Sequence, residues 1–119
     1  LELTFARAGH PYPILIRGTE QPKQLEIRGS LLGIFEDAEY IEGKVQLQKG
    51  DKLLLYSDGA EGVVGCLGDH GGFQFGEGFC QIKDFSIDEM MDRMNKLVQN
   101  QKVTPVEIDD VTAVGLEIL

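Results

Sequence analysis

The sequence lacks the residues that several classes of protein need. It has only two cysteines, Cys66 and Cys80, which do not form a CxxC pair, so neither a zinc site nor a disulfide framework is indicated. No apolar run approaches the roughly 20 residues of a membrane span, and no signal-peptide pattern opens the chain. We therefore expect a cytoplasmic location without membrane contact.

Basic residues are also scarce. The 119 residues include 11 Lys and Arg against 20 Asp and Glu, which gives a net charge of -9. Phosphate backbones and anionic lipids repel such a chain, so nucleic acid and membranes are not expected partners. A phosphorylated protein would be repelled as well, unless a bound metal ion reversed the local sign.

The arrangements typical of covalent catalysis are missing too. No Ser-His or Cys-Arg pair has the spacing of a nucleophile and its activator. The glycine-rich stretch 61–75 has no Lys, Ser or Thr and so cannot be a phosphate-binding P-loop. We expect this stretch to form a mobile loop or flap.

What the sequence does contain is an apolar run at 52–57 that stops at Asp58-Gly59. The run has no clear alternation, which predicts a strand buried on both faces. An isolated buried carboxylate is costly, so Asp58 must be solvated, paired or bound to a cation. An Asp-Gly pair after a strand is most often a turn, and this motif alone does not decide its use.

The C-terminal stretch 107–119 supplies further acids. Val114, Leu116 and Ile118 alternate with other residues in a predicted terminal strand, which Asp109 and Asp110 precede. If this strand runs antiparallel to 52–57 in one sheet, Asp58 and Asp109 share one rim. Carboxylates that converge there repel one another unless a hard divalent cation holds them.

Five motifs follow one another along the chain: Ala8-Gly9-His10-Pro11, Leu32-Gly33-Ile34, Gly50-Asp51 leading to Ser57-Asp58-Gly59, Phe75-Gly76, and Asp109-Asp110-Val111-Thr112. In this order they closely resemble the C-terminal half of the SpoIIE/RsbU-like branch of metal-dependent protein phosphatases (the PPM, or protein phosphatase type 2C, superfamily). The match spans essentially the whole chain. The resemblance implies an α-β-β-α sandwich, of which residues 1–119 form the C-terminal portion as a single domain.

The same resemblance implies an enzyme that hydrolyses phosphoserine or phosphothreonine in a bacterial regulatory protein. Two Mn²⁺ or Mg²⁺ ions would serve as cofactors, and a metal-bound water would attack phosphorus in line. By this likeness Asp58 and Asp109 match catalytic metal ligands, and Asp110 adjoins them as a further metal-site residue. Anti-sigma-antagonist proteins, the usual targets of the family, are the implied phosphoprotein partners.

The chain departs from the family pattern in two places. The family places a Glu four residues after the motif Asp, whereas Gly62 stands there and Glu61 comes one residue early. The Gly-Asp motif of the family's first strands, which supplies a bridging ligand, has no counterpart. Leu1, not Met, opens the chain within a strand, so we expect a piece of a longer protein. Two carboxylates cannot fill the octahedral shells of two metal ions, so we expect weak metal binding and little turnover. The missing front half should expose a sheet edge or an apolar face, which favours self-association.

Alternatives remain open at this stage. A degenerate, non-catalytic phosphatase or a small acidic domain could bind a protein or sense a ligand. His10 could be a metal ligand or a catalytic acid, although a loop histidine is the favoured interpretation because no second His or Cys lies at ligand spacing. Asp51 lies at the opposite strand end from Asp58 and is expected to be a turn acid.

The remaining pattern predicts an α+β fold with mainly antiparallel sheets and helices on one side. Expected strands cover 1–6, 14–16, 24–28, 40–47, 52–57 and 113–118, and expected helices cover 78–85 and 86–99. Gly43 suggests a bulge, and the segment 29–37 looks too apolar for a solvated loop. Ser86 opens a capping box, and the methionines of the second helix should face the core.

Overall fold

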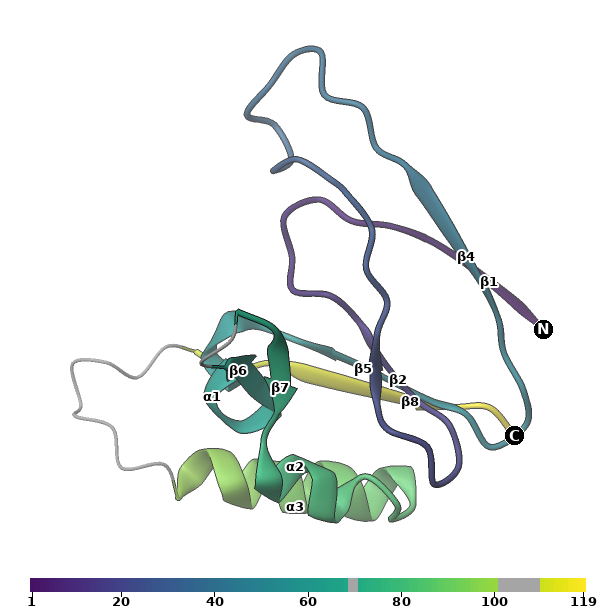
Figure 1. Ribbon diagram of the computed structural model, residues 1–119, viewed down its shortest axis with the longest axis vertical. Coiled ribbons are helices and arrows are strands. Elements are labelled where there is room, and N and C mark those ends of the chain that lie inside the picture. The colour runs from purple at the N-terminus through teal and green to yellow at the C-terminus, as the bar shows by residue number, and fades with distance from the viewer. Residues whose placement is uncertain (69–70, 101–109) are drawn as a thin grey trace.

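A computed structural model describes residues 1–68, 71–100 and 110–119. Its elements, most of them labelled in Figure 1, are β1 (Glu2–Ala6), β2 (Ile14–Ile16), β3 (Lys23–Gln24), β4 (Glu42–Gln46), β5 (Lys52–Tyr56), the 3-10 helix η1 (Asp58–Ala60), α1 (Glu61–Val64), β6 (Gly65–Leu67), β7 (Phe73–Phe75), α2 (Glu77–Ile82), α3 (Ile87–Gln99) and β8 (Ala113–Glu117). The predicted α+β class with antiparallel strands is confirmed. Within the described ranges, the helices are too short or too polar to cross a bilayer.

Strand β5 is the centre of the main sheet. Four strands are joined in the order β3-β2-β5-β8, and β5 pairs antiparallel with both β2 and β8. Strands β1 and β4 form a separate two-stranded sheet, and β6 and β7 form a hairpin. The predicted antiparallel pairing of 52–57 with the last strand is therefore confirmed.

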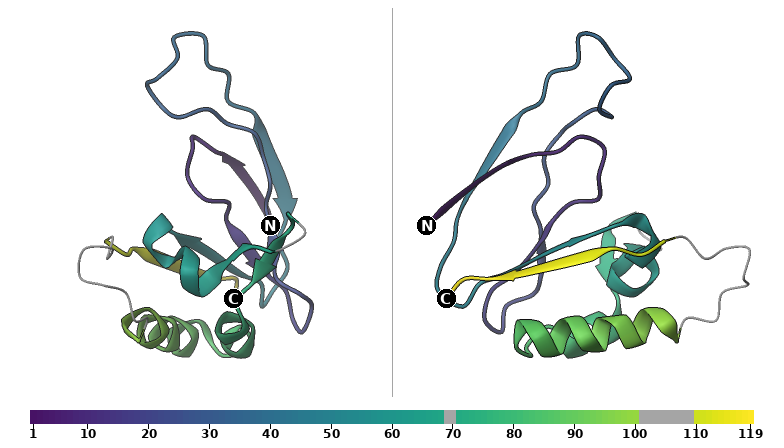
Figure 2. Two further views of the ribbon diagram at one scale, coloured as in Figure 1. Left: turned by 60° about the vertical axis from the view of Figure 1, so that its left-hand side comes forward. Right: turned by 180° about the vertical axis from the view of Figure 1, so that it is seen from behind.

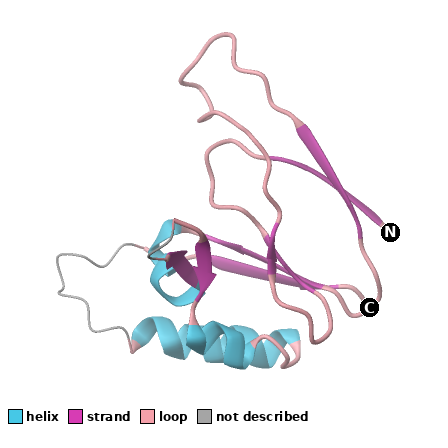
Figure 3. Cartoon of the chain, viewed as in Figure 1, coloured by secondary structure: helices cyan, strands magenta, loops and turns pink. Residues whose placement is uncertain are grey.

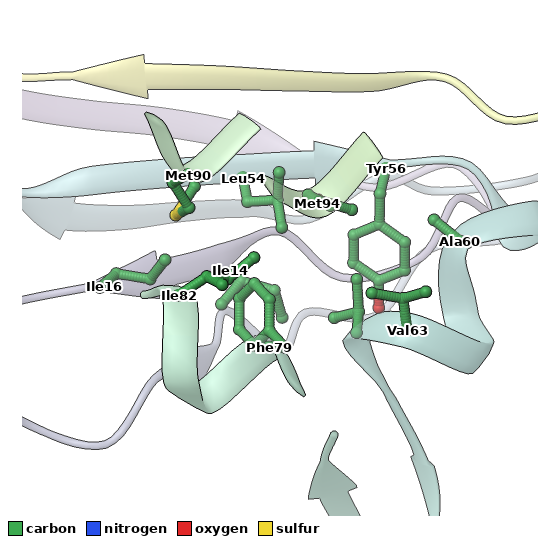
Figure 4. Close-up of a cluster of buried hydrophobic side chains, with 11 residues drawn as sticks. Ile14, Ile16, Leu54, Tyr56, Ala60, Val63, Phe79, Ile82, Met90 and Met94 are labelled. Atoms are coloured by element: carbon green, nitrogen blue, oxygen red, sulfur yellow. The ribbon is translucent and has the colours of Figure 1, made fainter. Parts of the chain in front are cut away.

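Successive residues of β5 face two different cores. Leu54 and Tyr56 are buried with Ile14 and Ile16 against side chains of α1, α2 and α3 (Figure 4). Leu53 lies in a second cluster that packs against β1 and β4. The helices thus gather on one face of the main sheet, as predicted (Figure 3). Full burial of one aliphatic side chain stabilises the folded state by about 1.5–3 kcal/mol.

Helix α3 packs closely on β8. The Ser86 hydroxyl accepts the Glu89 backbone N–H at the helix start, and Met90 and Met94 are buried, which confirms the predicted core-facing methionines. A Cβ added to Gly115 would lie 2.6 Å from Cδ1 of Ile87. The absence of a side chain at this strand position therefore lets the helix approach the sheet.

The stretch 61–75 differs from the predicted loop in its described part. It forms α1 and the β6–β7 hairpin, because Val63 and Val64 are buried in the helix-side core. A Cβ on Gly65 would lie 2.4 Å from the Gln74 carbonyl oxygen, and one on Gly76 would lie 2.4 Å from that of Val63. These glycines serve close packing, which a sequence pattern does not distinguish from loop flexibility.

Three smaller expectations are also corrected. The β1–β4 register continues through Gly43 without a bulge. The glycine instead serves close packing, because a side chain there would collide with Phe5 and Ile27. The strand expected at 24–28 ends at Gln24, since its register partner Ile14 begins β2. Helix α2 ends at Ile82 rather than 85, and the Lys52 ammonium group caps it by donating to the carbonyls of Lys83 and Phe85.

The segment 28–41 extends away from the main sheet and the helices (Figure 2). Its side chains Leu31, Leu32, Ile34 and Phe35 are 55–74% exposed, so the expectation that the segment is too apolar for solvent is wrong for the described chain. A second exposed apolar surface, the open sheet face, consists of Leu55, Val114 and Leu116 at the β8 side of the sheet.

Candidate functional site

Ser57 joins the end of β5 to the start of β8. Its backbone N–H donates to the Thr112 carbonyl at 2.8 Å, and its Oγ accepts the Thr112 N–H at 2.9 Å. The same hydroxyl donates to the Asp110 carbonyl at 3.3 Å. Because Asp58 directly follows Ser57, the exposed acids Asp58 and Asp110 lie at one border of the main sheet.

The third predicted site residue, Asp109, lies outside the described residues. Its pairing with Asp58 stays a prediction. The pairing of β5 with β8 shows why the sequence alone could predict that acids after β5 and before β8 share a border. An antiparallel partner of β5 must begin where β5 ends, and Tyr56 pairs with Ala113 at that end.

A hollow of about 460 Å³ opens at the same border. One wall comes from the turn after β1, with Arg7, Gly9, His10 and Pro11, and the other from the end of β5, with Ser57, Asp58 and Glu61. The lining therefore combines two carboxylates with one guanidinium and one imidazole. Its volume lies within the ~300–1,000 Å³ range of typical ligand pockets.

Sequence reasoning did not bring His10 to Asp58, because it did not predict the pairing of β2 with β5. The β2–β5 register pairs Ile14 with Leu54. The residues before β2 and after β5 therefore lie at the same end of the sheet, where His10 and Asp58 line one hollow. Arg7 and Glu61 were likewise not predicted as site residues, and both line the hollow.

Close contacts at two glycines hold the turn that carries His10. Gly9 has φ +88°, and a Cβ there would lie 2.3 Å from Cδ2 of Leu31. A Cβ on Gly29 would lie 1.6 Å from the Arg7 carbonyl oxygen. Only glycine tolerates these approaches, so the 7–13 turn and the 28–41 segment fix each other.

Asp51 is confirmed as a turn acid distant from this border. Arg17 donates to both of its carboxylate oxygens, at 2.9 and 2.6 Å, and the Gln48 backbone N–H donates at 2.7 Å. The hydrogen bond from Arg17 is the main cause that lowers the pKa of Asp51, with the Gln48 bond also lowering it against the opposing effect of burial. This acid is used to close the turn before β5.

The described donors suit a hard divalent ion in type but fall short in number. Asp58 and Asp110 offer exposed carboxylates, the ligands that Mg²⁺ and Mn²⁺ prefer. Across residues 1–68, 71–100 and 110–119, no three His, Cys, Asp or Glu side chains gather closely enough to hold a metal ion. Two carboxylates cannot complete an octahedral shell, as the sequence also indicated.

Comparison with known proteins identifies what the arrangement resembles. The model of the family Stage II sporulation protein E (SpoIIE) matches residues 1–119. A search of curated proteins gives no match.

Solved structures share the fold. The PP2C phosphatase domain with a regulatory fragment of the cell fate determinant SpoIIE from Bacillus subtilis superposes with a TM-score of 0.70 at 21% identity, covering 98% of this chain and 34% of that one. The RsbU and RsbW domains of a Mycobacterium tuberculosis protein give 0.70 at 21% identity, covering 98% and 32%. A serine/threonine phosphatase from S. agalactiae gives 0.61 at 16% identity, covering 99% and 54%. The chain thus spans about a third to a half of these structures.

Proposed function

The chain belongs to the SpoIIE family, and on that basis we propose that it is the C-terminal portion of a metal-dependent protein serine/threonine phosphatase domain. Its reaction would be the hydrolysis of phosphoserine or phosphothreonine in a bacterial regulatory protein. The observation that carries the proposal is the Ser57 bridge, which brings Asp58 and Asp110 to one border of the sheet.

Charge supports a cation at this border. Asp58 and Glu61 line one wall of the hollow, Asp110 lies beside them, and the whole chain carries -9. A dianionic phosphoryl group cannot approach such a surface favourably without a neutralising charge. We assign Asp58, Asp109 and Asp110 as the residues that would hold Mn²⁺ or Mg²⁺. When bound, such ions supply an activated water and neutralise phosphoryl oxygens.

The chain's own residues position this site. Ser57 fixes the backbone on both sides of the border through its three hydrogen bonds. Buried Tyr56 and Ala60 anchor the residues before and after the acidic motif in the helix-side core. Asp58 is therefore carried on a short segment between two fixed points, which sets the position of its backbone at the border.

We infer that another part of the same domain completes the site and that residues 1–119 are its C-terminal portion. The described donors are too few for a two-metal centre, and the open sheet face of Leu55, Val114 and Leu116 lacks a cover among the described residues. This chain alone should bind metal weakly and turn over little. Its phosphoprotein partner would be an anti-sigma-antagonist protein in the cytoplasm.

A non-catalytic module is the second candidate. It is favoured by Gly62 at the place where the family has a Glu, and by the lack of a three-ligand cluster among the described residues. Such a degenerate domain would keep the fold and bind a protein or a ligand without hydrolysis.

Titration calorimetry and a phosphatase assay separate the candidates. In a protein that contains the complete domain, Asp58→Asn and Asp109→Asn should abolish both Mn²⁺ affinity and hydrolysis of a phosphoserine peptide. Asp37→Asn, an exposed acid on the 28–41 segment, is the control and should change neither. Unchanged Mn²⁺ affinity in the two site variants would refute the metal-site assignment, and robust hydrolysis by this chain alone would refute the incomplete site.

A further inference from the structure

The hollow at the sheet border has two walls of different charge. Asp58 and Glu61 form the acidic wall, while Arg7 and His10 form the opposite wall on the turn after β1. We propose that Arg7, assisted by His10, is a binding site for the phosphoryl group of the substrate. This inference rests on the proposed phosphatase function, and it assigns phosphoryl binding to the wall opposite the metal-binding acids.

Arg7 is held in place by two contacts. Its Nε donates to the His10 carbonyl oxygen at 2.5 Å, and its guanidinium carbon lies 4.4 Å from the centroid of the Tyr12 ring. A guanidinium fixed by a hydrogen bond and an aromatic face loses little further side-chain entropy when it binds an anion. The side chain is therefore preorganised at the wall of the hollow.

The terminal amino groups of Arg7 remain available. Among the described residues, the hydrogen bonds of Arg7 involve Nε, and no ion pair connects its guanidinium to a carboxylate. Two parallel N–H groups on a planar fork match two oxygens of a phosphoryl group. The amino groups that have no partner in the described part of the chain thus have the geometry that a phosphate ester requires.

The position of His10 adds a second donor. Its carbonyl is occupied by Arg7, and its exposed side chain belongs to the same wall. Even a neutral imidazole carries one N–H, which can donate to a phosphoryl oxygen. Because His10 and Asp58 line the same hollow, a phosphoryl group between the walls would meet both.

The charges of the two walls should affect phosphate binding in opposite ways. Among the described residues that line the hollow, Arg7 is the one guanidinium or ammonium group, against two carboxylates. The acids therefore oppose phosphate binding when no metal is present, and neutralising one of them should strengthen it. Removing Arg7 should have the opposite effect. If Arg7 only braced the turn, neutralising an acid and removing Arg7 would not be expected to change phosphate affinity in opposite directions.

The experiment is a metal-free titration of the full 119-residue chain with orthophosphate in the presence of a chelator. Ionic strength is held constant, and binding is followed by the NMR shifts of the Gly9 and His10 backbone amides. The parent chain, Asp58→Asn, Arg7→Met and the double variant are compared. Arg93→Met is the matched control, because Arg93 makes the same two kinds of contact and does not line the hollow. Its Nε donates to the Glu89 carboxylate at 2.9 Å, and its guanidinium carbon lies 4.2 Å from the centroid of the Phe85 ring.

Asp58→Asn should bind orthophosphate several-fold more tightly than the parent, and adding Arg7→Met should weaken binding by about tenfold or more, as loss of a charge-assisted hydrogen bond does. Arg93→Met should stay within about twofold of the parent. If Arg7→Met does not fold, Arg7→Lys keeps the charge without the fork and should weaken binding by about threefold or more. Equal affinity with and without the Arg7 guanidinium, or no shift at Gly9 and His10 even in Asp58→Asn, would overturn the inference.

This test is independent of the metal site. It uses neither Mn²⁺ nor turnover, so a failed metal-site assignment would leave the phosphate result interpretable. Conversely, loss of Mn²⁺ binding in Asp58→Asn together with unchanged phosphate binding in Arg7→Met would keep the phosphatase proposal and remove only the assignment of Arg7.

Discussion

The hydroxyl oxygen of Ser57 accepts the backbone N–H of Thr112 at 2.9 Å, across a sequence separation of 55 residues. The reverse backbone bond, from the Ser57 N–H to the Thr112 carbonyl, measures 2.8 Å. This reciprocal pair joins the ends of two strands at the point where each is flanked by an aspartate. The geometry of the candidate site therefore depends on a serine as well as on the acids.

Replacing Ser57 by Ala should loosen the border without removing a carboxylate. We expect a loss of about 1 kcal/mol in the free energy of unfolding, because the Thr112 N–H loses its partner. Urea unfolding measures this loss. In the complete domain, Mn²⁺ affinity should fall several-fold by calorimetry. Ser30→Ala is the control, and an equal effect of both changes on Mn²⁺ affinity would count against the bridge.

Gly115→Ala should disturb the contact between β8 and α3. The new Cβ would lie 2.6 Å from Cδ1 of Ile87 and 2.9 Å from Sδ of Met91, so these side chains must move. The expected loss in the free energy of unfolding is about 1–3 kcal/mol, measured by urea unfolding. Gly72→Ala is the matched control, because a Cβ there would meet open space among the described residues. A Gly115→Ala protein as stable as the control would contradict this packing.

The Arg17–Asp51 pair predicts a particular dependence of stability on pH. The folded state lowers the pKa of Asp51 below its ordinary value of 3.8, chiefly through the Arg17 hydrogen bond. Its contribution is therefore present above about pH 3.8 and is lost as pH falls through the lower, folded pKa. Asp51→Asn should destabilise the protein by roughly 1–3 kcal/mol at neutral pH, and by less in acid.

Urea midpoints across the acidic range check this prediction. The exposed acid Asp37, changed to Asn, provides the control and should leave the pH profile of the parent intact. If Asp51→Asn lost the same stability at every pH, protonation of Asp51 would not explain the acid sensitivity.

The open sheet face predicts self-association of the isolated chain. Val114 and Leu116 are each 49% exposed on β8, the edge strand of the main sheet, next to Leu55. Exposed apolar strands at an edge favour pairing with another chain. Sedimentation at high concentration should give a mass above the 13.2 kDa monomer, and Val114→Lys should restore the monomer.

A change of equal chemistry elsewhere provides the comparison. Leu67 is 74% exposed on the β6–β7 hairpin, and Leu67→Lys should leave the association unchanged. A parent chain that remains monomeric at high concentration would remove the open face as an association surface.

Local patterns predicted much of the fold. Alternation located β1, β4 and β8, the apolar run located β5, and the Ser86 cap located the start of α3. These signals depend on neighbours in sequence, which a single chain displays directly. The stretch 61–75 was predicted wrongly because a glycine needed for close packing, such as Gly65, has the same sequence pattern as a glycine in a loop. Phe73 and Gln74 come close to Gly65 only through the pairing of β6 with β7, which local sequence does not reveal.

The positions of two candidate site residues, though not their roles, were predicted from the same kind of local pattern. Asp58 and Asp110 follow from strand ends in an antiparallel pair, which the β5–β8 register confirms as a shared border. The wall with Arg7 and His10 required the pairing of β2 with β5, and strand pairing is a long-range property that the pattern left open. Asp109 stays a prediction, because it lies outside the described residues.

The central claim is that acids from two distant parts of the chain meet at one border and bind a divalent cation. Paramagnetic broadening of backbone amide signals by substoichiometric Mn²⁺ tests it most directly, because the effect falls steeply with distance from the ion and detects weak binding. The account predicts selective loss of the signals of residues 57–59 and 110–112 together, and recovery of both sets in Asp58→Asn. Broadening of one set without the other, or broadening spread evenly over the acidic surface, would contradict it.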